Sequence, residues 1–251
     1  MSRISDAFNN KKAFIPFITS GDPDVNTTIK AVKAMAEAGA DIIELGIPFS
    51  DPTAEGPVIQ EANIRALKNG ITTDKVFDMV KEIRKDVKIP LVFMTYSYGT
   101  ERFMKNSAEV GIDGIIIADV PYEEKEEFNS VSSRYGIDFI SLIAPTSCDR
   151  IGMIAKEAEG FVYCVSSLGV TGTRSKITTD ISKMVKSVKE AKDIPCAVGF
   201  GISTPEQAAE MAKYADGVIV GSAIVNKCAE YGENCISHIY DYVKSMKSVL
   251  K

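Results

Sequence analysis

One carboxylate lies inside a short apolar run and two more lie in the loop that follows it, a placement that suits proton-transfer chemistry. Residues 41–59 read D-I-I-E-L-G-I-P-F-S-D-P-T-A-E-G-P-V-I, with Glu44 inside an expected strand and Asp51 and Glu55 in the loop that its glycines and prolines predict. A charge in a buried strand costs free energy unless it has a partner or a function. One interpretation is a structural carboxylate with a hydrogen-bonding partner. The other pairs a rigid acid, Glu44, with a second acid on a loop, Glu55, for proton transfer at two places on one substrate.

Residue types that serve metal or nucleophilic catalysis are scarce in this chain. The single histidine, His238, lies in a late helical segment whose neighbours indicate packing, so we expect neither a Ser-His-Asp triad nor a histidine-based metal site. The five cysteines form no C-x-x-C pair and have no metal-like spacing. Cys164 and Cys196 lie in apolar runs typical of small core residues. The sequence therefore predicts carboxylate chemistry without a metal.

The composition narrows the class of protein. The 251 residues carry a net charge of −5, with a pI near 5.2, and the Lys and Arg residues are spread out, which argues against a nucleic-acid-binding surface. The first residues lack the apolar core of a signal peptide, and no apolar run reaches about 18 residues, the length of a membrane-spanning helix. We expect a soluble cytoplasmic protein.

The elements that must position the carboxylates alternate between strand and helix. Strands are expected at 13–18, 41–45, 91–96, 114–118, 138–144, 161–165, 196–199 and 217–220. Helices are expected at 4–9, 25–38, 58–68, 73–86, 100–110, 123–135, 149–158, 179–191, 205–214, 223–230 and 236–249.

The strands are continuous apolar runs, as in parallel strands that are buried on both faces. Eight such units without a linker predict an α/β fold: one (β/α)8 TIM barrel domain over residues 1–251. A short N-terminal helix precedes the barrel, and extra helices follow strands 2 and 8. An open doubly wound sheet is the alternative.

A barrel would gather the candidate residues at one end. Active sites of such barrels lie at the C-terminal ends of the strands. Glu44, Glu55, Asp119 and Tyr163 all fall at or just after such ends, so we expect them to face one mouth. Because the interior of a barrel is packed with apolar side chains, this placement favours a function for Glu44 over a purely structural role.

Glycine-containing turns follow the last three strands and indicate a phosphate site. They lie at 169–172, 199–203 and 221–222, and the last opens a short helix at 223–230. Glycine lets the backbone approach phosphate oxygens, and the free N–H groups of a helix N-terminus favour an anion. Barrels frequently bind phosphate with these loops and a short extra helix. We therefore expect a phosphomonoester substrate.

Six segments in order make the chain similar to the α subunit of tryptophan synthase along nearly its full length. They are P-F-I-T-S-G-D-P (16–23), E-L-G-I-P-F-S-D-P-T-A-E-G-P (44–57), A-D-V-P-Y-E-E (118–124), G-V-T-G (169–172), G-F-G-I-S (199–203) and G-S-A-I-V (221–225). The resemblance implies a TIM barrel that cleaves indole-3-glycerol phosphate to indole and glyceraldehyde 3-phosphate without a cofactor. It also implies an α2β2 complex in which indole passes to a β subunit that uses pyridoxal phosphate.

The same resemblance implies a role for each site residue. Glu44 matches the general acid/base that protonates the indole carbon at the scissile bond, Tyr163 matches a tyrosine beside that acid, and Glu55 matches the acid of the loop. The positions that match the phosphate pocket are Gly172, Gly201, Gly221 and Ser222, and those that match the packing surface for the indole ring are Phe17 and Met94.

Glu55 departs from the family pattern, which usually has Asp in A-D-G-P where this chain has A-E-G-P. The extra methylene carries the carboxylate further unless the loop draws back. A misplacement of about 1 Å can slow a reaction on the order of 100-fold. We expect the loop to compensate, since the other matched parts of the site are retained.

The loop after Tyr96 is shorter than the family usually has, with Ser97-Tyr98-Gly99-Thr100 following at once. In the family that loop lies at the mouth and touches the β subunit, so three hypotheses stay open. The chain is a lyase that works with a β subunit, a stand-alone indole-releasing lyase, or a weakly active barrel that binds the phosphate ligand and acts as an allosteric partner. A phosphosugar isomerase would not explain the pattern at 44–57.

Overall fold

The computed structural model describes residues 2–97, 100–166, 181–199 and 201–250 of the chain. Within them, parallel strands form one curved sheet in the order β5-β4-β3-β2-β1-β9-β8-β7-β6. The strands are β1 Ala13–Thr19, β2 Ile43–Gly46, β3 Leu91–Thr95, β4 Gly114–Ile117, β5 Asp138–Phe139, β6 Ser141–Ile143, β7 Val162–Val165, β8 Cys196–Gly199 and β9 Gly217–Val220.

The two edge strands of this order, β5 and β6, are neighbours in the chain and close the sheet into a barrel. Phe139 of β5 pairs with Ile115 of β4, whereas Leu142 of β6 pairs with Tyr163 of β7. Only Ile140 separates them, and its N–H donates to the carbonyl of Ile115 at 2.9 Å. The prediction of one strand over 138–144 was wrong, because the segment changes its pairing partner half-way. The prediction of a barrel is confirmed, and the open doubly wound sheet is excluded.

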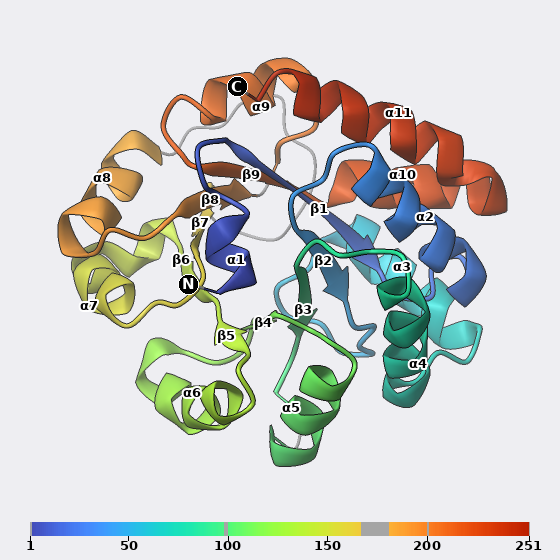
Figure 1. The fold of residues 1–251 in the computed structure, drawn as a ribbon, viewed down its shortest axis with the longest axis horizontal. Coiled ribbons are helices and arrows are strands. Elements are labelled where there is room, and N and C mark those ends of the chain that lie inside the picture. The colour runs from blue at the N-terminus through green and yellow to red at the C-terminus, as the bar shows by residue number, and fades with distance from the viewer. Residues whose placement is uncertain (1, 98–99, 167–180, 200, 251) are drawn as a thin grey trace.

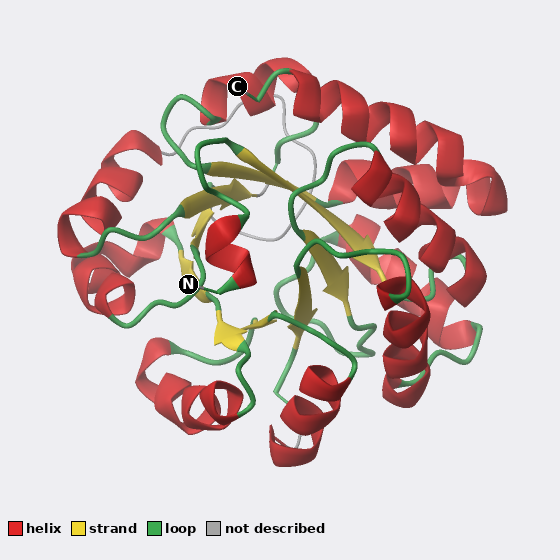
Figure 2. Cartoon of the chain, viewed as in Figure 1, coloured by secondary structure: helices red, strands yellow, loops and turns green. Residues whose placement is uncertain are grey.

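Helices surround the barrel as an outer ring, and α1 lies across one end of it (Figure 1). Figure 2 separates this ring of helices from the strands inside it. The helices are α1 Arg3–Asp6, α2 Val25–Glu37, α3 Pro57–Lys68, α4 Thr73–Arg84, α5 Thr100–Glu109, η1 Tyr122–Glu124, α6 Lys125–Arg134, η2 Pro145–Arg150, α7 Ile151–Lys156, α8 Ile181–Ala191, α9 Pro205–Met211, α10 Ser222–Tyr231, η3 Gly232–Asn234 and α11 Cys235–Ser248. The expected extra helices correspond to α3 after β2 and α10 after β9.

Local sequence signals explain where several helices begin. The Asp24 side chain caps α2 by accepting from the N–H of Thr27 at 2.9 Å. Thr204 and Gln207 form a capping box at the start of α9. Among the described residues, no helix has both the length and the apolar character needed to cross a membrane.

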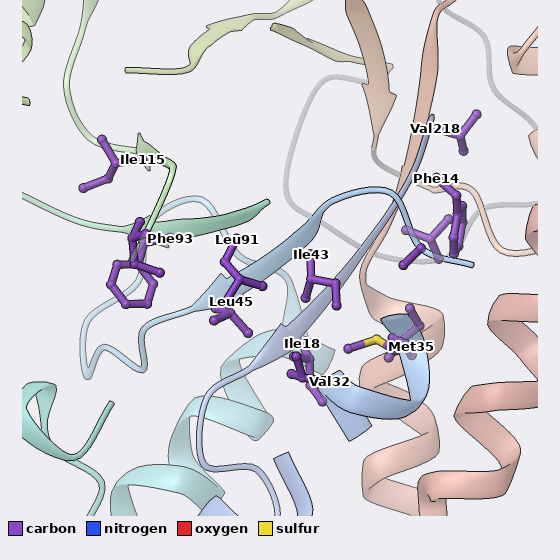
Figure 3. Packing of buried hydrophobic residues seen from close by; sticks show 14 of the residues in the cluster. Phe14, Ile18, Val32, Met35, Ile43, Leu45, Leu91, Phe93, Ile115 and Val218 are labelled. Carbon is purple, nitrogen blue, oxygen red and sulfur yellow. The ribbon is translucent and has the colours of Figure 1, made fainter. Parts of the chain in front are cut away.

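The core has an outer and an inner layer, and strand alternation assigns side chains to each. Phe14 and Ile18 of β1 and Leu45 of β2 point outward, toward the cluster that contains Val32 and Met35 of α2 (Figure 3).

Residues between these positions point into the barrel, where Ile15, Val92 and Phe161 form a second cluster that Ile4 and Phe8 join from the N-terminal side. The same alternation turns Phe17 of β1 and Glu44 of β2 inward. The end opposite α1 is left for the site.

Candidate functional site

One cavity at the C-terminal ends of the strands brings together eight of the nine predicted site residues. Its walls are formed by Phe17, Glu44, Glu55, Ile59, Met94, Tyr163, Gly201, Ile202, Ile219, Gly221 and Ser222. The ninth, Gly172, lies outside the described residues. Asp119, which we expected at the same mouth, does not line this cavity; it is exposed and accepts hydrogen bonds from the N–H and Oγ of Ser97 at 2.9 and 2.8 Å.

Glu44 is the buried acid of the cavity. It lies between Phe17 of β1 and Val92 of β3 in the parallel register, and only 1% of its surface is exposed. Its Oε2 has no hydrogen-bonding partner in the described part of the chain. Burial disfavours the ionised form and raises the pKa of Glu44 from 4.5 to about 8. The side chain therefore carries a proton at neutral pH and is able to donate it.

Glu55 reaches the cavity from the loop between β2 and α3. Its carboxylate accepts a hydrogen bond from the hydroxyl of Tyr96, and its carbonyl accepts one from Nε2 of Gln60 at 2.8 Å. Burial raises the pKa of Glu55, and the bond from Tyr96 opposes that rise. Glu55 and Glu44 thus have different environments within one cavity, as acid and counter-charge require.

Tyr96 is a residue that the sequence analysis did not assign to the site. It follows β3 directly, and its contact with Glu55 joins residues 41 positions apart in the chain. Strand alternation could have predicted its direction, because Val92 and Met94 point inward and Tyr96 is the next residue on that side of the strand. The partner of its hydroxyl could not be read from the local pattern.

Glycines make room for two aromatic rings of the cavity. A Cβ added at Gly199 would lie 2.7 Å from Cζ of Tyr163, and one added at Gly46 would lie 2.7 Å from Cε2 of Phe17. Tyr163 is buried, and desolvation, followed by the charge of Glu44, raises the pKa of its hydroxyl well above the usual 10. A neutral phenol therefore stands beside the acid.

Gly221 and Ser222, at the N-terminus of α10, form another part of the cavity wall. Gly221 is the N-cap residue, and no side chain caps this helix end. The amide groups of the first turn and the helix dipole favour an anion here. Gly201 adds a turn whose backbone, with φ of +88°, suits glycine. This wall can hold a phosphate group.

Other candidate centres are not supported by the described residues. No group of three or more His, Cys, Asp or Glu side chains there is placed to hold a metal ion. His238 stacks on Tyr231 with ring centroids 3.7 Å apart and does not line the cavity. Cys164 and Cys196 are fully buried, as expected of core residues.

Comparisons with known proteins agree with this geometry. The family model for the tryptophan synthase alpha chain matches residues 5–251. The tryptophan synthase alpha chain of Lacticaseibacillus casei is 48% identical over 98% of this chain and 95% of its own length. That of Thermoanaerobacter sp. (strain X514) is 46% identical over the full length of both. A chain of tryptophan synthase from Mycobacterium tuberculosis has a TM-score of 0.89 at 35% identity, covering 99% of this chain and 98% of its own.

A chain from the tryptophan synthase α2β2 complex of Pyrococcus furiosus has a TM-score of 0.87 at 36% identity. It covers 94% of this chain and 98% of its own length.

Proposed function

This chain belongs to the tryptophan synthase alpha chain family, and we propose that the cavity around Glu44 is where the reaction of that family takes place. The chain is a lyase of tryptophan biosynthesis that cleaves indole-3-glycerol phosphate to indole and glyceraldehyde 3-phosphate. One observation carries the proposal. A fully buried glutamate with a pKa of about 8 shares a cavity with a second carboxylate and an uncapped helix N-terminus.

Glu44 acts as the general acid/base of a retro-aldol cleavage. Its proton passes to the indole carbon at the scissile bond, which converts the ring to an indoleninium cation. The bond to the glycerol carbon then breaks, its electron pair returns to the ring, and that carbon becomes the aldehyde as its hydroxyl loses a proton. Glu44, now ionised in the same cavity, is placed to accept that proton.

Glu55 and Tyr163 assist this step in different ways. Protonation of the ring carbon leaves positive charge on the ring nitrogen, and the Glu55 carboxylate stabilises that charge in a site with little water. Tyr163, whose hydroxyl is neutral, holds the indole ring beside Glu44. The ring packs against Phe17 and Met94.

The phosphate of the substrate binds at the N-terminus of α10. The backbone groups of Gly201, Gly221 and Ser222 supply donors without a lysine. Gly172, outside the described residues, is assigned to the phosphate by the sequence resemblance alone. Gly221 and Ser222 line the same cavity as Glu44, so a substrate held there by its phosphate has its glycerol chain inside the cavity. Binding energy from the phosphate thereby orients the scissile bond.

A β subunit is the partner of this chain in an α2β2 complex, as in the solved complex from Pyrococcus furiosus. Residues 1–251 act as one barrel domain. The chain works in the cytoplasm, which the free cysteines among its described residues support, since disulfides are rare in that compartment.

Indole release from indole-3-glycerol phosphate tests the proposal, with and without a β subunit from the same source. We expect a basal rate that rises on addition of β, and its near-total loss in Glu44→Gln. Glu44→Asp keeps the carboxyl group but shortens its reach, so it should retain a measurable part of the rate.

A substantial wild-type rate that ignores β would identify a stand-alone lyase, the alternative suggested by the short loop after Tyr96. Full activity in Glu44→Gln would overturn the role of Glu44. An absence of indole in every condition, with an effect on the β reaction preserved, would identify an allosteric partner.

A further inference from the structure

We infer that Tyr96 is a positioning residue for Glu55 and that its hydroxyl fixes how far this longer carboxylate reaches into the cavity. This role rests on the proposed function of Glu55 as the carboxylate beside the indole nitrogen.

The hydroxyl of Tyr96 can point its proton only at Glu55. The oxygen accepts the N–H of Thr53 at 2.9 Å and the N–H of Ala54 at 3.1 Å. A hydroxyl has two lone pairs and one proton, so these two bonds occupy its acceptor capacity. The remaining proton is donated to Oε2 of Glu55. Because Tyr96 is 4% exposed, water does not compete freely for this bond.

The Tyr96 ring is itself held firmly by the barrel. It directly follows β3, which is paired on both sides, and it stacks on Phe49 with ring centroids 4.7 Å apart. The loop that carries Glu55 is also tied at its start, where the N–H of Ile47 donates to the carbonyl of Met94 at 2.9 Å. Tyr96 therefore links the middle of this loop to the strands of the barrel, in addition to the bond that Gln60 of α3 donates to the Glu55 carbonyl.

A glutamate needs this restraint more than an aspartate does. Its side chain has one more rotatable bond, so an unrestrained carboxylate would populate positions differing by more than 1 Å. The bond from Tyr96 holds Oε2 of Glu55, and this residue lines the cavity. A donor of this kind also favours the ionised carboxylate, the form that stabilises positive charge on the ring.

The variant Tyr96→Phe removes one oxygen and keeps the ring. We expect kcat to fall about 10- to 100-fold while KM for indole-3-glycerol phosphate changes little, since phosphate and ring contacts remain. The acid limb of the kcat–pH profile should move to higher pH, because the buried Glu55 loses a donor that lowers its pKa.

Tyr135→Phe is the matched control, because the hydroxyl of Tyr135 also donates to a carboxylate, that of Glu101, on the exposed outer ring. It should leave kcat and its pH profile unchanged.

A double-mutant cycle tests the pairing itself. Glu55→Asp withdraws the carboxylate from Tyr96, so the two single changes remove the same contact. We expect the double variant to lose much less than the product of the two single effects. Independent effects that multiply would overturn the pairing.

A readout that does not depend on activity separates this inference from the proposed function. The pKa of Glu55 is followed by NMR of 13C-labelled glutamate carboxyls, assigned with Glu55→Gln, and should rise in Tyr96→Phe. An unchanged NMR pKa, or an unchanged kcat and pH profile, would overturn the inference. If Glu55→Gln alone kept full activity, the proposed role of Glu55 would fail and the positioning role with it. The NMR titration would still show whether the contact exists.

Discussion

The ring of Tyr163 lies against the backbone of Gly199, so closely that a methyl group at Gly199 would come within 2.7 Å of the ring carbons Cε1 and Cζ. The two residues belong to neighbouring strands, β7 and β8, and the pairing of Val165 with Gly199 sets their relative height. The missing side chain of Gly199 thus leaves the space that the ring of Tyr163 occupies. Tyr163 in turn lines the cavity that contains Glu44.

Gly199→Ala should displace Tyr163 and slow the reaction. The added methyl must push the ring into the cavity, where a shift of about 1 Å can reduce kcat on the order of 100-fold, and overpacking should lower the free energy of unfolding by about 1–3 kcal/mol. Indole release and urea unfolding measure the two effects. Gly152→Ala is the control, since the nearest side-chain atom to its added methyl is 4.0 Å away in a helix. Equal kcat values and equal free energies of unfolding in the two variants would show that Tyr163 does not depend on the space at Gly199.

Glu44→Gln should be inactive, and its stability relative to the wild type should increase as the pH rises. The pKa of Glu44 is about 8 in the folded chain against 4.5 as its ordinary value. Below pH 4.5 the carboxyl is protonated in both states, and its contribution to stability is fully present. That contribution is lost as the pH rises toward 8, because the unfolded chain ionises first.

Glutamine cannot ionise, so its advantage in the free energy of unfolding should grow by about 1.4 kcal/mol per pH unit at most over this window. Urea unfolding at pH 5, 6, 7 and 8 measures the difference between variant and wild type. Glu37→Gln, on the exposed side of α2, serves as the control and should show no such growth. A constant difference for Glu44→Gln would mean that Glu44 is not desolvated as described.

Gly221→Asp should weaken phosphate binding without unfolding the chain. A negative charge interacts favourably with the dipole at a helix N-terminus, so α10 should stay folded. Its charge would repel a phosphate at the same helix end, and KM for the substrate should rise at least tenfold. Inhibition by glycerol phosphate should weaken in parallel.

Gly221→Asn adds nearly the same bulk without the charge and separates repulsion from crowding, since the new Cβ would stand 3.3 Å from Phe17. Equal losses in both variants would assign the effect to crowding and not to an anion site.

Arg65→Met should destabilise the chain through Asp22. The guanidinium of Arg65 binds both carboxylate oxygens of Asp22 at 2.8 Å, and Asp22 is 1% exposed. Removal of the arginine leaves a buried charge without its partner, which typically costs about 3–5 kcal/mol. Urea unfolding measures the loss, and Lys68→Met, on the exposed end of the same helix, is the control. A loss under about 1 kcal/mol would indicate that water reaches Asp22 when Arg65 is removed.

The local sequence was sufficient for the architecture and for the positions of the acids. Continuous apolar runs between helical segments predict a barrel, because parallel strands that are buried on both faces carry mostly apolar side chains. Glu44 stands out since it interrupts such a run, and the glycine turns near Gly201 and Gly221 are visible without knowledge of any partner. These features depend on a few neighbouring residues, so they can be read along the chain.

The tertiary structure decided which side chains meet. Tyr96 binds Glu55 across 41 positions, Gly199 receives Tyr163, and the expected strand at 138–144 divides because its two halves pair with different neighbours. The protonation of Glu44 has the same origin, since its pKa rises only when the whole barrel excludes water from it. Such properties arise from the register and packing of distant segments, and no local pattern contains them.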